Sequence, residues 1–271
     1  MHTYLFVLSP PYCGSTVLWR LLATSPAASA HPTEGQSVDG VRHIMRDRKP
    51  WDPRKKFPWA EIKQKWENVW DMSKPVLLEK SPPNIVWALE IERIFKPSYF
   101  IVIMRDPYAF CEGRRRRHKG SHINESAEFW VTCANYQLRN MEKLTNVTHF
   151  TYEALADNPA AIKQQILSFL PDLQDIDTTL AFKARSISKP SKQTIRNLNQ
   201  EKINLLSSAD IESVNAVLER NKHLMEFFGY KFLRSDFRHS LRYLRATAAL
   251  NTLNALENGK RFGARLLKRD Q

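Results

Sequence analysis

One segment near the start of the chain has the composition of a loop that holds an anion. The apolar run YLFVL is continued by SPPYCGSTVLWR at residues 9–20. Gly14 lets the backbone approach a ligand closely, and the hydroxyl groups of Ser15 and Thr16 are hydrogen-bond donors. A helix that begins here offers unpaired N–H groups and the positive end of its dipole. The segment therefore predicts a phosphate or sulfate site at a strand-to-helix turn.

Two familiar chemistries of such loops fit these residues poorly. A nucleotide-hydrolysing P-loop carries a lysine directly before its Ser or Thr, and no lysine precedes Ser15. Phosphatases that attack through a cysteine place an arginine six residues later. Counted from Cys13 that position is Trp19, and Arg20 lies one residue too far. We interpret Cys13 as a small loop residue rather than a nucleophile.

Two cations further along the chain stand where apolar strands are expected to end. Arg105 follows YFIVIM, where an unpaired charge would be costly, so the position favours an anionic partner. Lys80 follows VLLE and precedes a Ser-Pro turn, which favours a functional lysine over an exposed turn residue. Both are candidates for the charge that the loop itself lacks.

The elements that must position these residues alternate between strands and helices. Strands are expected at 3–8, at 76–78, over YFIVIM and within HFTYEAL; helices at 16–24, from Trp59, at about 84–95, after Pro107, within NPAAIKQQILSFLP and over 200–228. The basic, proline-rich stretch 42–58 is expected to be a loop, and Gly229 ends the last helical stretch. This alternation predicts an α/β domain around a parallel sheet.

Four segments, in order, resemble sulfotransferases that use 3′-phosphoadenylyl sulfate (PAPS), of the carbohydrate and tyrosylprotein types. The loop Tyr12-Cys13-Gly14-Ser15-Thr16 resembles the family's 5′-phosphosulfate loop, basic-Ser-Gly-Thr-Thr. EKSPPN resembles a Glu-Lys-Ser/Thr-Pro segment, and FIVIMRDPYAFCEG the 3′-phosphate element. FTYEALADNPAAIKQQILSFL is similar to a Tyr-Glu-x-Leu segment, and FFGY is also seen in the family. The resemblance covers about residues 3–233. We therefore expect one sulfotransferase domain at residues 1–233, followed by a basic helical extension at residues 234–271.

The resemblance implies an α/β, P-loop-like three-layer fold with a central parallel sheet flanked by helices. It implies sulfuryl transfer from PAPS to a hydroxyl acceptor by in-line displacement, without a metal and with 3′,5′-diphosphoadenosine (PAP) as the product. Since EKSPPN resembles the carbohydrate branch, we expect a carbohydrate or glycolipid as the acceptor.

The resemblance also implies roles for individual residues. Tyr12 to Thr16 would hold the 5′-phosphosulfate, largely through the backbone N–H groups of Gly14, Ser15 and Thr16, and Arg105 would grip the 3′-phosphate. Lys80 would neutralise the departing oxygen. Glu34, about twenty residues past the loop, would be the general base, with His31 as the alternative.

Two positions depart from the family pattern. Tyr12 stands where the family loop has Lys or Arg, and Gly113 stands where a serine eight residues past the arginine bonds the 3′-phosphate. We expect Lys80 and one or more of the arginines from Arg114 to Arg117 to compensate. The same departures leave open a protein that binds PAP without turnover.

The composition leaves other functions open. The chain has 271 residues, 42% apolar and 25% charged, and a formal net charge of +13, which favours anionic partners of several kinds. A nucleotide-dependent kinase on a related framework is one alternative, although it lacks the P-loop lysine. A nucleic-acid-binding module using RRRRHK is another; we expect no nucleic acid. Three cysteines, no apolar run near the ~18 residues of a membrane span and no recognisable secretory signal favour a cytoplasmic protein.

Two further segments carry weaker hypotheses. Trp51, Trp59, Trp66 and Trp70, beside the basic loop, suggest an acceptor site, but for Trp59 and Trp66 we favour core anchors of an amphipathic helix. In the extension 234–271 basic residues outnumber acidic ones, and Phe237, Leu241 and Leu244 recur at helical spacing. This pattern suggests peripheral contact with an anionic membrane, or else a helix with a solvated basic face.

Overall fold

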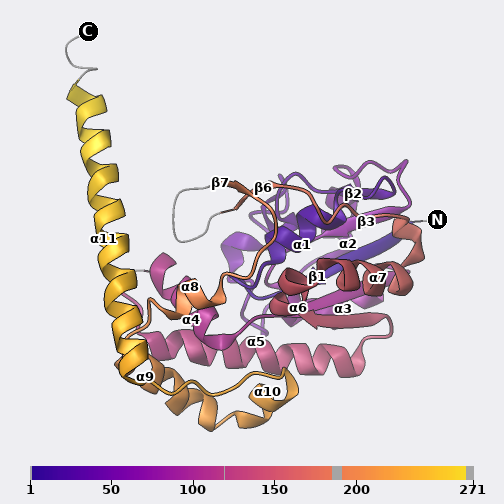
Figure 1. The fold of residues 1–271 in the computed structure, drawn as a ribbon. Coiled ribbons are helices and arrows are strands. Elements are labelled where there is room, and N and C mark those ends of the chain that lie inside the picture. Colours follow the sequence, from indigo (N-terminus) through magenta and orange to yellow (C-terminus); the bar gives the residue numbers. More distant parts are fainter. Residues whose placement is uncertain (1, 119, 185–190, 267–271) are drawn as a thin grey trace.

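The computed structural model describes residues 2–118, 120–184 and 191–266. Its centre is a sheet of five parallel strands in the order β2-β3-β1-β4-β5 (Figure 1). The strands are β1 (Thr3–Leu8), β2 (Ala28–Ala30), β3 (Val76–Glu79), β4 (Ser98–Met104) and β5 (Val147–Thr151). Since β1 is central, the chain passes to one side of it for β2 and β3 and to the other for β4 and β5. The carboxyl ends of β3, β1 and β4 therefore meet at a topological switch point.

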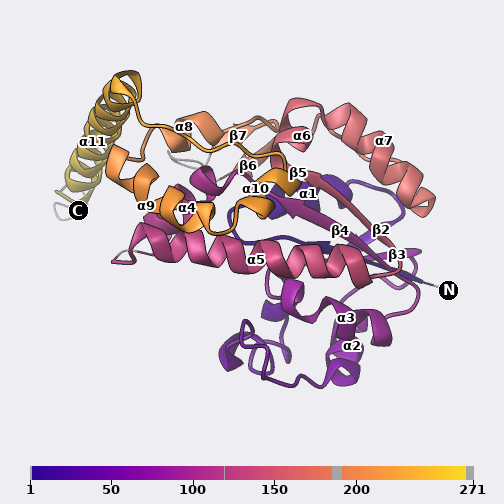
Figure 2. The same ribbon diagram turned by 90° about the horizontal axis from the view of Figure 1, so that it is seen from below.

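Helices cover both faces of the sheet, which makes the three layers that the sequence predicts. One face packs on α1 (Ser15–Leu22), α6 (Tyr152–Asp157) and α7 (Pro159–Phe169), and the other on α2 (Trp59–Glu67), α3 (Asn84–Ile94) and α5 (Ile123–Lys143) (Figure 2). Side chains of β1 alternate between the two, as a strand requires: Phe6 packs with α2 and α3, while Leu5 and Val7 pack with α1 and α7.

A third apolar cluster lies beyond the sheet, where α4 (Pro107–Arg117) and α5 meet α9 (Ser208–Glu219) and α10 (Lys222–Phe227). Along the chain, the antiparallel pair β6 (Phe182–Ala184) and β7 (Ser191–Gln193) and then α8 (Asn199–Ile203) come before α9, and α8 packs against α4. Short 3₁₀ turns occur at Gly35–Ser37, Arg46–Arg48 and Pro171–Leu173. This cluster fixes α4 and α8 beside the carboxyl end of β4.

The strands expected from the apolar runs are confirmed, and so is the core role of Trp59 and Trp66, which are 5% and 0% exposed. The long helix α5 was not predicted. Its buried face includes Gln137 and Asn140, which interrupt the apolar pattern. Their side-chain amides donate to backbone carbonyl groups, Leu8 O at 2.7 Å and Ile85 O at 2.8 Å. These bonds satisfy the polar groups inside the core.

The last described helix, α11 (Phe237–Leu266), begins against the domain and then projects away from it (Figure 1). His239 is buried at its start, with Nε2 2.8 Å from Leu206 O. Further along, Leu244 and Leu253 are 62% and 51% exposed. Within the described part of the chain, no helix combines the length and the apolar character that crossing a membrane requires.

Candidate active site

A cavity of about 510 Å³ opens at the carboxyl edge of the sheet, at the switch point. Its lining draws on the segment after every strand: Gly14 to Thr16 after β1, Glu34 after β2, Lys80 after β3, Arg105 after β4 and Tyr152 after β5. Residues that lie far apart in the sequence thus meet at one edge, because all five strands point the same way.

The loop after β1 has the backbone that anion binding needs. Gly14 has φ 85° and directly precedes α1. The unpaired N–H groups of the first turn of α1 therefore lie where the loop lines the cavity. A Cβ atom at position 14 would lie 2.5 Å from Cδ2 of Tyr152, whose side chain is buried. Only glycine therefore fits, for both its dihedral angle and its space.

Glu34 and Lys80 form an ion pair on the cavity wall. Lys80 Nζ lies 2.5 Å from Glu34 Oε1, and Gln36 Nε2 donates to Glu34 Oε2 at 2.6 Å. Lys80 is 5% exposed although it lines the cavity. The general-base candidate and the cation are thereby held at one place.

The buried side chain of Glu79 holds the turn that carries Glu34. Glu79 accepts from the backbone N–H of Gly35 at 2.8 Å and from Ser81 Oγ at 2.6 Å, while Gln36 N donates to the same Ser81 oxygen at 2.9 Å. Burial raises the pKa of Glu79 to about 7. These bonds tie the turn that follows Glu34 to the end of β3.

The Arg105 guanidinium is buried, and two of its three nitrogen atoms donate hydrogen bonds to described residues. Its Nε donates to Asn199 Oδ1 at 2.7 Å and its Nη1 to Tyr12 O at 3.1 Å, and the guanidinium lies 4.0 Å from the centre of the Tyr152 ring. Among the described residues, Nη2 has no hydrogen-bond partner. A buried guanidinium with an unsatisfied donor that lines a cavity fits an anionic ligand there.

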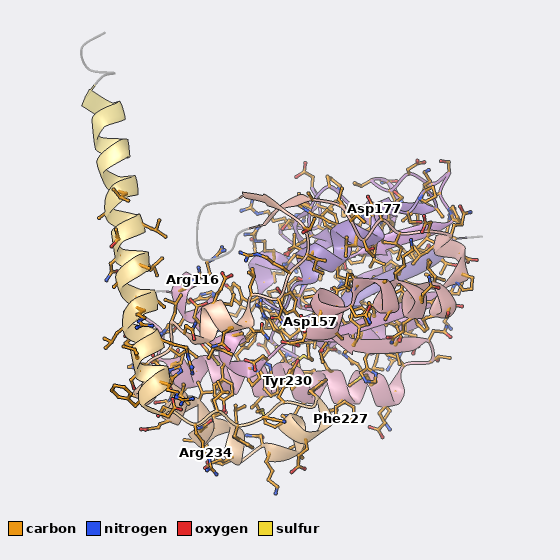
Figure 3. All side chains as sticks on the ribbon, viewed as in Figure 1. Arg116, Asp157, Asp177, Phe227, Tyr230 and Arg234 are labelled. Atoms are coloured by element: carbon orange, nitrogen blue, oxygen red, sulfur yellow. The ribbon has the colours of Figure 1, made fainter. Side chains whose placement is uncertain are left out.

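Glu153 and Tyr230, from the Tyr-Glu-x-Leu and FFGY segments, help to orient Arg105. Glu153 accepts from the backbone N–H of Asp106 at 3.0 Å, from Tyr230 Oη at 3.1 Å and from Asn199 Nδ2. Tyr230, labelled in Figure 3, belongs to the FFGY segment. Because Asn199 in turn binds Arg105 Nε, these residues fix the guanidinium in one orientation.

The cations of the cavity lie outside the loop after β1. Tyr12 lines the cavity with its hydroxyl 3.1 Å from His118 Nε2, and burial raises its pKa, which keeps it neutral. Positive charge comes from Lys80, Arg105 and Lys202, and from Arg20, Arg116 and Arg117; Arg116 is labelled in Figure 3. Gly113 also lines the cavity, where Lys202 Nζ occupies the space that a side chain would need.

Three of the predicted site residues are not among those that line the cavity. His31 is 1% exposed and stacks on Trp70 at 4.2 Å, and burial lowers its pKa to about 4. Cys13 is fully buried in an apolar cluster, which raises the pKa of its thiol. Arg114 packs against α5, with its guanidinium 5.0 Å from the Phe129 ring centre and Nη1 3.3 Å from Ser126 Oγ. Glu34 is therefore the base candidate that the structure brings to Lys80.

Some lining residues escaped the sequence reasoning. Tyr152 was seen only as part of a motif, and Lys202 lies in the stretch 200–228, which was predicted only as helical. Leu198 precedes that stretch, in a segment for which no element was predicted. Trp51 is partly buried against Phe129, at 5.0 Å between ring centres, while Trp70 is 4% exposed in the core. The tryptophans therefore do not form one exposed platform.

Comparison with known proteins agrees with this geometry. The profile of the sulfotransferase family matches residues 5–175. A sulfotransferase domain from the Synechococcus PCC 7002 olefin synthase has a similar fold, with 19% identity and a TM-score of 0.55 over 86% of this chain and 96% of that one. A sulfotransferase domain from the curacin biosynthetic pathway aligns at 18% identity and a TM-score of 0.52 over 86% and 99%. Sulfotransferase STF9 from Mycobacterium avium aligns at 14% identity and a TM-score of 0.51, over 86% of this chain and 79% of that one. No curated protein sequence matches the chain.

The family profile, from residue 5 to residue 175, covers well over half of the chain. The chain belongs to the sulfotransferase family. It is accordingly a PAPS-dependent sulfotransferase with the three-layer α/β fold that the sequence predicts. Between the alternatives that the sequence left open, the family decides for sulfuryl transfer over a kinase or a nucleic-acid-binding module.

Proposed function

We propose that the cavity transfers the sulfuryl group of PAPS to a hydroxyl group of a carbohydrate or glycolipid, with Arg105, Lys80 and Glu34 in separate roles. The observation that supports this best is the unsatisfied nitrogen of Arg105, in the same cavity as the first turn of α1. Together they would provide two anion sites, one for the 5′-phosphosulfate and one for the 3′-phosphate of the nucleotide.

The residues at hand suit these two groups. Backbone N–H groups from Gly14 to Thr16, with the Ser15 hydroxyl, would hold the 5′-phosphosulfate, with Tyr12 and Cys13 shaping the loop. Arg105 would hold the 3′-phosphate, and Arg116 adds charge to the same cavity. When bound, PAPS supplies the activated sulfuryl group.

Lys80 and Glu34 then account for the chemistry of transfer. Glu34 can accept the proton of the acceptor hydroxyl, and Lys80 can neutralise the negative charge that develops during transfer. Their ion pair, 2.5 Å long, fixes both groups before substrates bind. Catalysis of this kind depends mainly on positioning and electrostatics, which a rigid wall at the end of β3 can supply.

The acceptor proposal rests on the EKSPPN segment and on charge. Arg20 and Arg117 line the cavity, and an acidic glycan would be attracted to such a site. A panel of oligosaccharides, a glycolipid and a tyrosine peptide, each incubated with radiolabelled PAPS, tests it. Labelling of the sugars and not of the peptide is expected. Labelling of the peptide alone would leave the transferase in place and refute the acceptor.

We further propose a cytoplasmic enzyme that contacts anionic membranes through α11, which follows the catalytic domain of residues 1–233. Phe237 is 82% exposed and Leu244 62% exposed, and arginines 238, 242 and 245 lie in the same helix. Co-sedimentation with vesicles rich in anionic lipid should fall when residues 234–271 are removed. Equal recovery of both chains with the vesicles would contradict the membrane contact.

A further inference from the structure

Gly113 occupies an unusual position for a glycine, in the interior of α4. Glycine costs a helix roughly 1 kcal/mol relative to alanine, so its presence needs a reason. A Cβ atom built at this position would lie 2.6 Å from Lys202 Nζ and 3.4 Å from Tyr12 Cβ. The ammonium group of Lys202 thus occupies the space that any side chain at 113 would need.

Lys202 comes from α8, which packs against α4, and it lines the cavity although it is only 6% exposed. Its nearest carboxylate is Glu112, at 3.8 Å. Glu112 is already engaged by Arg116, whose Nε lies 2.8 Å and Nη2 3.2 Å from its two oxygens. Lys202 therefore shares Glu112 with Arg116, and the charges of Arg105 and Arg116 both disfavour its ammonium form.

We propose that Lys202 binds the 3′-phosphate of the nucleotide together with Arg105 and makes the site selective for 3′-phosphorylated adenylates. This inference rests on the proposed function. A dianionic phosphate would satisfy both the ammonium group and the unsatisfied Nη2 of Arg105. The glycine at 113 is what admits the lysine to this position, so the two residues act as a pair.

The charge environment gives this role a signature in pH. Burial lowers the pKa of Lys202 to about 7, and the charge of Arg105 adds to the effect. The groups that face Lys202 are Arg105 after β4, Glu112 and Arg116 of α4, and Cys13 of the loop after β1. A bound phosphate stabilises the ammonium form, so binding of PAP near pH 8 should take up a proton and should weaken as the pH rises.

The test is calorimetric titration of the full chain with PAP and with AMP, which lacks the 3′-phosphate. Lys202→Met should lower the affinity for PAP about 10- to 100-fold and leave that for AMP within about twofold. It should also abolish the proton uptake, measured in buffers of different ionisation enthalpy. Lys222→Met, at an exposed lysine of α10, should change neither affinity.

The outcomes separate the two levels of the account. If the wild-type chain prefers PAP and Lys202→Met keeps both that preference and the proton uptake, Lys202 is only a structural partner of Glu112 and the inference is wrong. If the wild-type chain does not prefer PAP to AMP, the proposed function itself fails. Should Lys202→Met not fold, Gly113→Ala displaces the ammonium group instead, and an unchanged ratio of the two affinities there would overturn the inference.

Discussion

Gly35→Ala is the change that best tests how the candidate base is held. A Cβ atom at position 35 would lie 2.7 Å and 2.8 Å from two ring atoms of Trp66, where ordinary carbon contacts are about 3.5–4.0 Å. Trp66 is fully buried and donates from Nε1 to Gly35 O at 3.0 Å, so the ring has little room to move. The turn itself must shift by about 1 Å and carry Glu34 with it.

The magnitude follows from that shift. Overpacking of this kind costs about 1–3 kcal/mol of folding stability, and a misplacement of about 1 Å in a catalytic group can cost roughly 100-fold in rate. Arg105 follows a different strand, β4, so the affinity for PAP should stay the same. Chemical denaturation, calorimetry and the rate of sulfuryl transfer measure the three quantities.

Thr33→Ala is the matched control, because Thr33 is an exposed residue of the same loop. It should leave stability and rate nearly unchanged. If Gly35→Ala proved folded and fully active, Glu34 would not depend on this packing, and its assignment as a positioned base would be refuted.

Two more predictions concern the end of β3. Lys80→Met should lower kcat by about 100- to 1,000-fold, as loss of a charge-stabilising donor does, whereas Lys163→Met on α7 should not; equal rates would remove Lys80 from the mechanism. Burial raises the pKa of Glu79 from its ordinary value of 4.5 to about 7, so the folded state binds this proton more tightly than the unfolded chain does. Stability should therefore fall by about 3 kcal/mol as the pH rises from about 4.5 to 7, and Glu79→Gln should flatten this slope in urea titrations. An unchanged slope in that variant would show that Glu79 is not the group responsible.

The residues predicted best from the sequence are those at the ends of strands. Lys80 and Arg105 follow apolar runs, and the carboxyl ends of parallel strands must meet, so their convergence follows from the fold. Gly14 and Ser15 were predicted because a helix that begins after a strand offers unpaired N–H groups to an anion. These predictions depend only on local pattern and on one rule of topology.

Other residues depend on packing that the sequence does not reveal. Which arginine of RRRR reaches the cavity depends on the rotation of α4, and it is Arg116 and Arg117 rather than Arg114. His31 has the chemistry of a base, but Trp66 and Trp70 bury it. Lys202 reaches the cavity from α8, 97 positions after Arg105 in the sequence, and no local motif predicts that it belongs to the site.

The measurement that tests the central claim most directly is thermal melting of the full chain with PAP, with AMP and with ATP–Mg²⁺. A ligand at about a hundred times its dissociation constant stabilises by about 2.7 kcal/mol, which raises the Tm of a domain of this size by roughly 5–10 °C. The cavity around Arg105 and the first turn of α1 predicts such a rise with PAP and a much smaller one with the other two nucleotides. No rise with PAP, or an equal rise with ATP–Mg²⁺, would contradict it.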